Sequence, residues 1–242
     1  MRGGSAKALL ACAAFLSLSL LLPPASAQDA DDLVFTAMRS EMDRSLRRLA
    51  LEGSGPPYHI LYRLTDRRNR AISATLGALT DERSEDSRTL YVEVRVGGPE
   101  LDNTTLGARG QSSPVPMDSS AMRQALWLLT DEAYKSALAG FLEKKARKAV
   151  ERDLEDAGDF SPEEPGRHRA PSLPPEDTGP WKDYIRALSA ELKDHADIYG
   201  SNVSLLLPWS RRLLLTSEGA EIASPRESMP VRLMVSGWTR SE

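Results

Sequence analysis

Cysteine is almost absent from the sequence. Cys12 is the only one among 242 residues, and it lies in an apolar run near the N-terminus. We expect it to leave with a signal peptide, because Leu9 and Leu10 are bulky where the signal of a lipidated cysteine has small residues. The remaining chain would then have no disulfide, no thiolate nucleophile and no cysteine ligand for a metal.

Histidine is nearly as scarce, and the common catalytic motifs are missing. The three histidines are His59, His168 and His195, and none is followed by glutamate, so no His-Glu-x-x-His zinc motif is present. Their surroundings predict three separate structural elements, so we expect no zinc site built from them. There is also no Gly-x-Ser-x-Gly elbow and no phosphate-binding glycine loop.

The sequence also has no long basic run, and its formal net charge is -4. This balance disfavours a nucleic-acid-binding surface. The composition, 40% hydrophobic and 27% charged, is ordinary for a globular protein with one large or two small domains.

Residues 1–27 have the pattern of a secretory signal peptide. Arg2 and Lys7 precede an apolar run over 8–22, and small residues at 25–27 offer a cleavage site between Ala27 and Gln28. The alternative is an uncleaved membrane anchor, but the run is shorter than the ~20 residues that span a bilayer. We therefore expect a secreted or periplasmic protein with no membrane span after the signal is removed.

The stretch from Arg88 to Asn103 gives the clearest structural signal. Apolar residues alternate with polar or aromatic ones over 90–96, which is the period of a β-strand with one buried face. We expect this to be the central strand of an antiparallel sheet. Two weaker strands are predicted before it, at 58–64 and 71–79, with charged turns at 66–69 and 81–87.

Two helices complete this region, which predicts an α+β fold with helices covering one sheet face. The first runs over 31–51, and its apolar stripe consists of Val34, Met38, Met42, Leu46 and Leu49. The second begins near 118–120, and its stripe consists of Met122, Leu126, Leu129, Ala133, Ala137 and Phe141. Residues 143–156 are almost wholly charged, which indicates a solvated extension or a contact with a partner.

The C-terminal part has a different composition. Residues 158–180 are rich in proline and predict a linker or exposed loop. A third helix is expected from Pro180 to about Asp194, with an inward face of Trp181, Tyr184, Ile185, Leu188 and Leu192. Strands follow at 202–207, 211–215 and 231–238, with a turn at 217–219. We therefore divide the mature chain into 28–157, 158–180 and 181–242, and we expect the last part to be incomplete.

Few polar residues stand out as binding candidates. Asp102 and Asn103 follow the best strand, and they could form either an Asx turn or part of a binding site. Two segments match the glycosylation acceptor pattern, 103–105 and 202–204. The tryptophans at 127, 181, 209 and 238 favour core or interface anchors over a ligand cage.

Several separated segments resemble one known family. They are the segments 58–62, 72–79, 90–97, 101–104, 125–135 and 213–219, the last of which reads LLLTSEG. Together, and in this order, they resemble the N-terminal half of secreted TldD/PmbA-type metallopeptidases, a group also labelled modulators of DNA gyrase. The likeness extends over nearly all of the mature chain outside the proline-rich segment.

The resemblance implies a zinc-dependent peptidase, but only for the full-length family. Its His-Glu-x-x-x-His zinc helix lies in the C-terminal half, and nothing in this sequence corresponds to it, so no catalytic or metal-binding residue is carried over. By this resemblance, the chain would supply walls of a cavity for a peptide substrate. It would also supply part of a homo- or heterodimer interface with a family member.

Three interpretations follow from these observations. The chain is the non-catalytic N-terminal portion of a TldD/PmbA-like zinc metallopeptidase. Alternatively, it is a free-standing non-catalytic module that pairs with a metal-bearing relative. The third interpretation is an unrelated secreted α+β protein.

Overall fold

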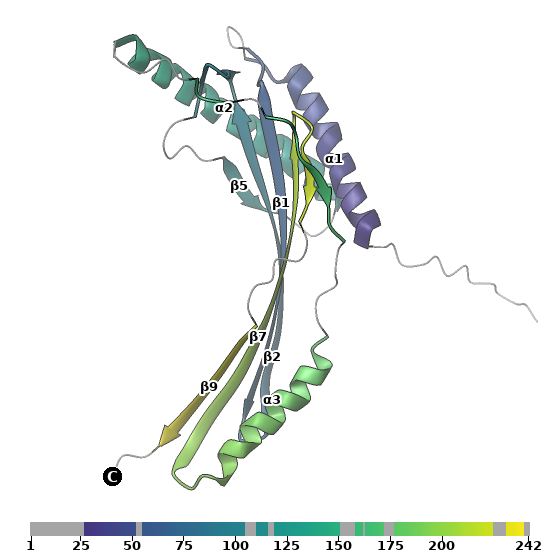
Figure 1. Ribbon diagram of the computed structural model, residues 1–242, viewed down its shortest axis with the longest axis vertical. Helices are drawn as coiled ribbons and strands as arrows, with labels where there is room; N and C mark the ends of the chain where they lie inside the picture. The colour runs from purple at the N-terminus through teal and green to yellow at the C-terminus, as the bar shows by residue number, and fades with distance from the viewer. Residues whose placement is uncertain are drawn as a thin grey trace, which may run out of the picture.

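A computed structural model describes residues 27–51, 55–104, 110–115, 119–150, 158–161, 163–171, 177–224 and 231–239. The protein is elongated, with one long twisted sheet and helices packed at both of its ends (Figure 1). Two helices, α1 and α2, lie at one end, here called the α1/α2 end, and α3 lies at the other, the α3 end. The α+β class expected from the sequence is confirmed.

Three unusually long antiparallel strands form the axis of the molecule. They are β1 (His59–Thr75), β2 (Ala78–Arg95) and β7 (Ile198–Thr216). β1 and β2 form a hairpin whose turn contains Leu76 and Gly77, with φ angles of 47° and 85°. β7 pairs with the other side of β1 over Leu61–Ala74, so β1 and not β2 is the central strand.

The charged stretches at 66–69 and 81–87 are strand residues, so the two predicted turns are wrong. Their charges are balanced across the sheet, since Arg70 donates to Asp86 at 2.6 Å and Arg88 donates to Asp66. Residues 66–70, 84–88 and 207–211 pair with one another midway along the sheet, and we call this region the waist. Sequence segments predicted as separate strands are therefore halves of continuous ones.

Shorter strands widen the sheet at each end. β5 (Gln111–Pro114) pairs with β2, and β8 (Glu221–Ala223) pairs with the second half of β7. β6 (Arg167–Arg169) runs parallel to β8, so part of the predicted proline-rich linker is a sheet strand. β9 (Arg232–Thr239) pairs with the first half of β7 at the α3 end. β3 (Gly97–Gly98) and β4 (Leu101–Asp102) form a separate small ladder.

The larger core lies at the α1/α2 end. α1 (Ala27–Arg48) and α2 (Ser119–Val150) pack on the same face of the sheet, onto alternate residues of β1, β2 and β7. The predicted stripes of both helices are buried or partly buried there, and Phe35, which the sequence analysis did not select, is fully buried as well. The sheet contributes to this core Ile60, Tyr62, Leu64, Leu90, Val92, Val94, Leu213 and Leu215, and Val96 joins it directly after β2.

A second, smaller core lies at the α3 end. α3 (Gly179–Glu191), followed by the 3-10 turn Leu192–Asp194, packs on Ile72, Ala74, Val203, Leu205 and Leu207. Ile185 is fully buried, and Trp181, Leu188 and Leu192 are partly buried, as predicted. Tyr184 was also expected to point inward, but it is half exposed and meets the ring of Trp181 edge-on.

Strands from the two predicted folded regions share the sheet, because β1 and β2 come from 28–157 and β7 from 181–242. The three-part division of the chain stays a prediction. The signal peptide and its cleavage after Ala27 also stay predictions, because residues 1–26 lie outside the described part; α1 begins at Ala27. In the part of the chain that the structure describes, no helix is long and apolar enough to cross a membrane.

Candidate functional site

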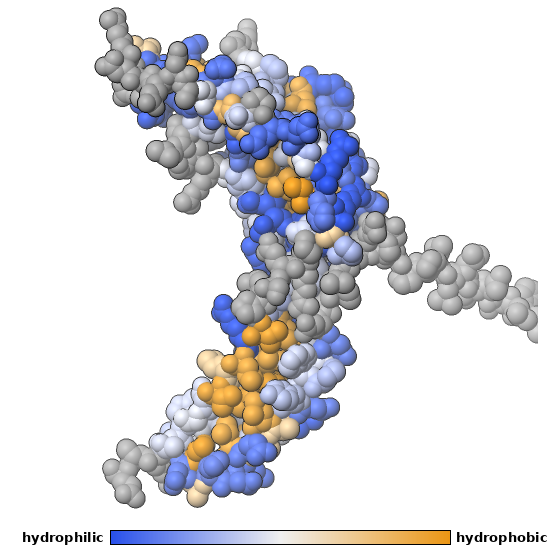
Figure 2. All heavy atoms as spheres, in the orientation of Figure 1, coloured by the Kyte–Doolittle hydropathy of each residue, from blue (hydrophilic) through white to orange (hydrophobic). Residues whose placement is uncertain are grey.

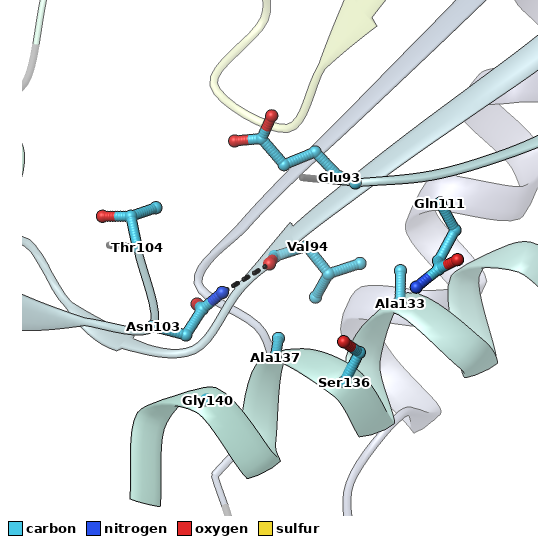
Figure 3. A pocket seen from close by; sticks show the side chains of 10 residues that line it. Glu93, Val94, Asn103, Thr104, Gln111, Ala133, Ser136, Ala137 and Gly140 are labelled. Carbon is cyan, nitrogen blue, oxygen red and sulfur yellow. Dashed lines mark hydrogen bonds between the residues drawn. The ribbon is translucent and has the colours of Figure 1, made fainter. Parts of the chain in front are cut away.

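A cavity of about 170 Å³ lies between α2 and the end of β2. Its α2 wall is made of small residues, which leave the space open, and Figure 3 shows them facing Val94 and Asn103. The lining residues with polar side chains are Glu93, Asn103, Thr104, Gln111 and Ser136. Of the two residues selected from the sequence, Asn103 lines this cavity.

Asn103 is held by the backbone of β2. Its Oδ1 accepts the Val96 N–H at 2.8 Å, and its Nδ2 donates to the Val94 carbonyl at 3.3 Å (Figure 3). The side chain therefore ties the segment after β4 to the end of β2. These contacts leave the asparagine hydrogen-bonded inside the fold, which argues against glycosylation at 103–105. Asn202 of the other acceptor pattern lies within β7, paired with Ser236.

Asp102 is fully buried, and its carboxylate is used within the protein. Oδ1 accepts the Thr104 N–H at 2.7 Å, which closes the Asx turn considered from the sequence, and Oδ2 accepts the Tyr58 hydroxyl at 2.8 Å. Arg95 and Lys144 lie 3.7 and 3.8 Å from the carboxylate. The Thr104 hydroxyl also donates to Oδ1. A buried carboxylate with two cations nearby and three hydrogen bonds is balanced, so we assign Asp102 a structural role. Sequence reasoning missed the contacts of Asp102 with Tyr58 and Lys144, because these two residues come from distant segments.

Arg95 and Lys144 extend this network to the residues after α2. Lys144 pairs with Asp159 at 2.6 Å, and Asp159 also accepts the Asp102 N–H at 2.9 Å. The Arg95 guanidinium lies 4.5 Å from the ring of Phe160 and 3.0 Å from Glu93. Lys144 belongs to the charged part of α2, so this part of the helix contacts the rest of the chain and is not wholly a solvated extension.

Burial shifts the acidity of the two aromatic hydroxyls near the cavity. Burial, and then the hydrogen bond to Asp102, raises the pKa of Tyr58 far above its usual value. Burial also raises the pKa of Tyr91, whose hydroxyl donates to Glu93 at 3.0 Å and accepts the Gly110 N–H. Both hydroxyls are therefore neutral hydrogen-bonding groups at ordinary pH, and neither is positioned as a general base.

His59 is the buried histidine of the chain. Burial lowers its pKa, although Glu218, whose Oε2 lies 3.5 Å from Nδ1, acts in the opposite direction. The ring of Phe160 lies 5.8 Å away. His168 lies on β6 and His195 follows the 3-10 turn, and both are exposed. The structure thus places the three histidines in three separate elements.

A zinc ion does not fit the described residues. Among them, no three histidine, cysteine, aspartate or glutamate side chains come close enough together to hold a metal ion. Asp102, Asp159 and Glu93 are each paired with a lysine or an arginine nearby. Cys12 lies outside the described residues.

A wider groove of about 650 Å³ lies between α1 and the β7–β8–β6 edge. Arg39 of α1 and Arg169 of β6 both bind the carboxylate of Glu221, and Arg169 also binds Asp32 of α1, so these two arginines are matched by two carboxylates. Arg211 of β7 is buried, and it bonds Asp31 of α1 and the carbonyls of Ala170 and Ser224. Sequence reasoning missed this arginine, because in a strand it resembles a solvated residue.

Among the described strands, the most exposed apolar one lies at the α3 end. This is β9, which pairs with β7, whereas α3 packs on β1, β2 and β7. Leu233, Met234, Val235 and Trp238 are between 45% and 58% exposed. Figure 2 shows apolar residues gathered on this part of the molecule. Of the four tryptophans, Trp209 is buried, and Trp127 and Trp238 are nearly half exposed.

No family model and no curated protein sequence matches the chain. Solved structures do match it, including that of a "putative modulator of a DNA gyrase" from Thermotoga maritima, with 10% identity and a TM-score of 0.43. TldE from Thermococcus kodakarensis matches with 11% identity and a TM-score of 0.42. A "putative modulator of DNA gyrase" from Bacteroides thetaiotaomicron matches with 15% identity and a TM-score of 0.43.

These matches cover 83–86% of this chain but only 38–43% of the other chains. The chain is thus similar to these three structures, and it spans about two fifths of their length.

Proposed function

We propose that this chain is the non-catalytic portion of a TldD/PmbA-like zinc metallopeptidase, in which the zinc ligands and catalytic groups come from other residues. One observation carries the proposal. The separated segments that resemble the family share one sheet and a helix packed on it. Within the sheet, 59–62 and 72–75 lie in β1, 78–79 and 90–95 in β2, and 213–216 in β7, and 125–135 lie in α2, which packs on β2. Segments that resemble one family and also form one sheet with its covering helix support a shared scaffold role.

In this role the chain supports a peptide-binding cavity and does no chemistry. The small residues of α2 and the hydrogen bonds of Asn103 keep an open space beside β2, which is a suitable wall for a cavity completed by other residues. The carboxylates around it are engaged in ion pairs. We place the protein outside the cytoplasm, in the periplasm or secreted, on the basis of residues 1–27.

The proposal is tested by measuring zinc and peptide cleavage with the purified protein. We expect far less than one zinc per chain by elemental analysis and no cleavage of a mixed peptide library. In the positive arm, a TldD/PmbA-type protein that carries the His-Glu-x-x-x-His motif is added. We expect peptide cleavage there, and we expect a chelator to abolish it. Tight stoichiometric zinc in this chain alone, with chelator-sensitive cleavage, would contradict the proposal.

A free-standing module that pairs with a metal-bearing relative is the second candidate, and the exposed apolar strand β9 favours it. The intact mass of the mature protein from its native host separates the two. A mass far above 26.6 kDa, the mass of the 242-residue sequence, indicates one part of a longer peptidase. A mass slightly below it, with Gln28 first, indicates the free-standing module.

A further inference from the structure

The groove of about 650 Å³ between α1 and the β7–β8–β6 edge plays no part in the proposed function. It lies at one edge of the sheet, whereas the cavity beside α2 lies near the opposite edge, where β5 pairs with β2. Its volume is typical of a small-molecule site. Met42, Leu46 and Leu215 give the groove an apolar wall. It is therefore large enough for a ligand that has an apolar part.

Arg167 lines this groove and has no ion pair among the described residues. It lies directly opposite Glu221 in the β6–β8 ladder, but Arg39 and Arg169 already bind the carboxylate of Glu221. The side chain of Arg167 makes one hydrogen bond within the described residues, from Nε to the Gly219 carbonyl at 3.2 Å. Its terminal nitrogens are therefore available for an anion, and a guanidinium binds a carboxylate well through two parallel hydrogen bonds.

The turn between β7 and β8 positions Arg167 and adds a second hydrogen-bond donor. A β-carbon at Gly219 would lie 3.5 Å from Nη2 of Arg167, so the guanidinium rests against this turn. Ser217, in the same turn, also lines the groove, and its Oγ accepts the Ile60 N–H at 3.0 Å. The hydroxyl proton of Ser217 has no acceptor among the described residues, so it is available to a ligand. Two donors thus lie beside one turn, next to the apolar wall.

The charges around the groove favour a ligand with a single negative charge. Its lining contains three arginines and two carboxylates, those of Asp43 and Glu221. Asp32 pairs with Arg169 but does not line the groove, and its side chain is 53% exposed to solvent. A dianion such as phosphate would be repelled by the two carboxylates of the lining more strongly than a monoanion. One ionised carboxylate is therefore the best match for Arg167.

We propose that this groove binds a carboxylate that is attached to an apolar group. The carboxylate accepts hydrogen bonds from the terminal nitrogens of Arg167 and from the Ser217 hydroxyl, and the apolar group lies against Leu46 and Leu215. The C-terminal residue of a short peptide has this chemistry, and so does a short fatty acid. The site needs neither zinc nor the cavity beside α2, so this proposal and the proposed function can each fail without the other.

Two-dimensional amide NMR spectra, recorded as a ligand is added to the purified protein, test the proposal. The probe is the peptide N-acetyl-Ala-Ala-Leu, and the same peptide with a C-terminal amide is its matched control. We expect the acid to shift the signals of the Gly219 amide and of the Arg167 Nε–H, and the amide to bind about tenfold more weakly or less. N-acetyl-Ala-Ala-Ser keeps the carboxylate but loses the apolar group, and it should bind about tenfold more weakly as well.

Isocaproate, which has only the carboxylate and the branched apolar group, separates the two sources of this chemistry. Binding as tight as that of N-acetyl-Ala-Ala-Leu supports the proposal with a simple fatty acid as ligand. Weaker binding, with the peptide still preferred over its amide, supports it with the end of a peptide as ligand.

Variants of the protein test the two donors. Arg167→Gln should weaken binding of the acid about tenfold or more, and Ser217→Ala about threefold. Arg186→Gln is the matched control, because Arg186 lies on α3 in an exposed ion pair, and it should bind the acid like the unaltered protein. Thermal melting checks that the variants are folded. Equal binding of acid and amide, binding unchanged by Arg167→Gln, or no binding at millimolar concentration would each overturn the proposal.

Discussion

The guanidinium of Arg88 binds the carboxylate of Asp66 through two hydrogen bonds, of 2.6 and 2.8 Å, between directly paired residues of β2 and β1. Both side chains are largely buried, so the pair is shielded from solvent. It lies in the waist, between the two apolar cores. Paired charges here allow one strand to pass through a polar region without a turn.

Replacing Asp66 by asparagine should destabilise the protein by about 1–3 kcal/mol, because it leaves the buried Arg88 guanidinium without a matching charge. Urea denaturation followed by circular dichroism measures the change. Asp81→Asn is the matched control: its partner Arg83 is 78% exposed, and the variant should be nearly neutral. Equal effects of the two changes would contradict this role of the waist pair.

Tyr62 should make the protein sensitive to alkali. Burial raises the pKa of its hydroxyl to about 12, from an ordinary value of 10. The unfolded tyrosine loses its proton first as the pH rises above 10, so stability falls between pH 10 and about 12. Tyr62→Phe removes this contribution and makes that fall less steep.

The same Tyr62→Phe change should cost about 1 kcal/mol at neutral pH, because the Tyr62 hydroxyl bonds the buried Thr130 hydroxyl at 2.9 Å. Urea midpoints at about pH 8 and at about pH 11 measure both effects. A variant that is as sensitive to alkali as the parent would show that other groups dominate the alkaline range.

His59 should make the stability of the protein depend on pH in the acidic range. Because burial lowers its pKa below the ordinary 6.5, the unfolded histidine binds a proton more readily than the folded one. Stability is therefore fully present above pH 6.5 and falls as the pH drops toward the folded pKa. His59→Gln should flatten this dependence between about pH 7.5 and about pH 5, whereas the exposed His195→Gln should leave it unchanged. A slope that is identical in both variants would exclude His59 as its source.

Arg211 should anchor the β6 segment. Its guanidinium bonds the carbonyls of Ala170 and Ser224 and the carboxylate of Asp31, and lysine cannot reach all three. Arg211→Lys should cost about 2 kcal/mol and expose the chain near 167–171 to trypsin. Limited proteolysis with mass spectrometry identifies the cuts. Arg186→Lys, at an exposed ion pair, serves as the control and should be cut like the parent.

The sequence predicted the buried faces of the elements better than their lengths. Alternation over 90–96 and the stripe of α2 are local patterns, and each lies in the core as expected. The charged residues 66–69 resemble a turn when read alone, since Arg88, the partner of Asp66, and Trp209, the partner of Arg68, lie far along the chain. These residues form a strand because they pair with β2 and β7, and such pairing cannot be seen in the sequence of one segment.

At the candidate site, too, the sequence could predict local contacts but not contacts between distant segments. An Asx turn at Asp102 depends on Thr104, two residues away, so the sequence could suggest it. The contacts with Tyr58 and Lys144 depend on how β1 and α2 pack, and no local pattern contains them. The strand at 231–238 was predicted almost at its observed bounds, but its exposure was not, because apolar residues usually indicate burial.

The distance between the two cores can change only in fixed steps, because it is set by the number of strand residues between them. β1, β2 and β7 present the same face to α1 and α2 as to α3, and this depends on an even count of residues through the waist. Because side chains alternate with a period of two, one extra residue in each strand would turn the second core to the opposite face. Two extra residues in each would keep it and move the cores about 7 Å further apart. The waist therefore works as a spacer whose length is counted in pairs of residues.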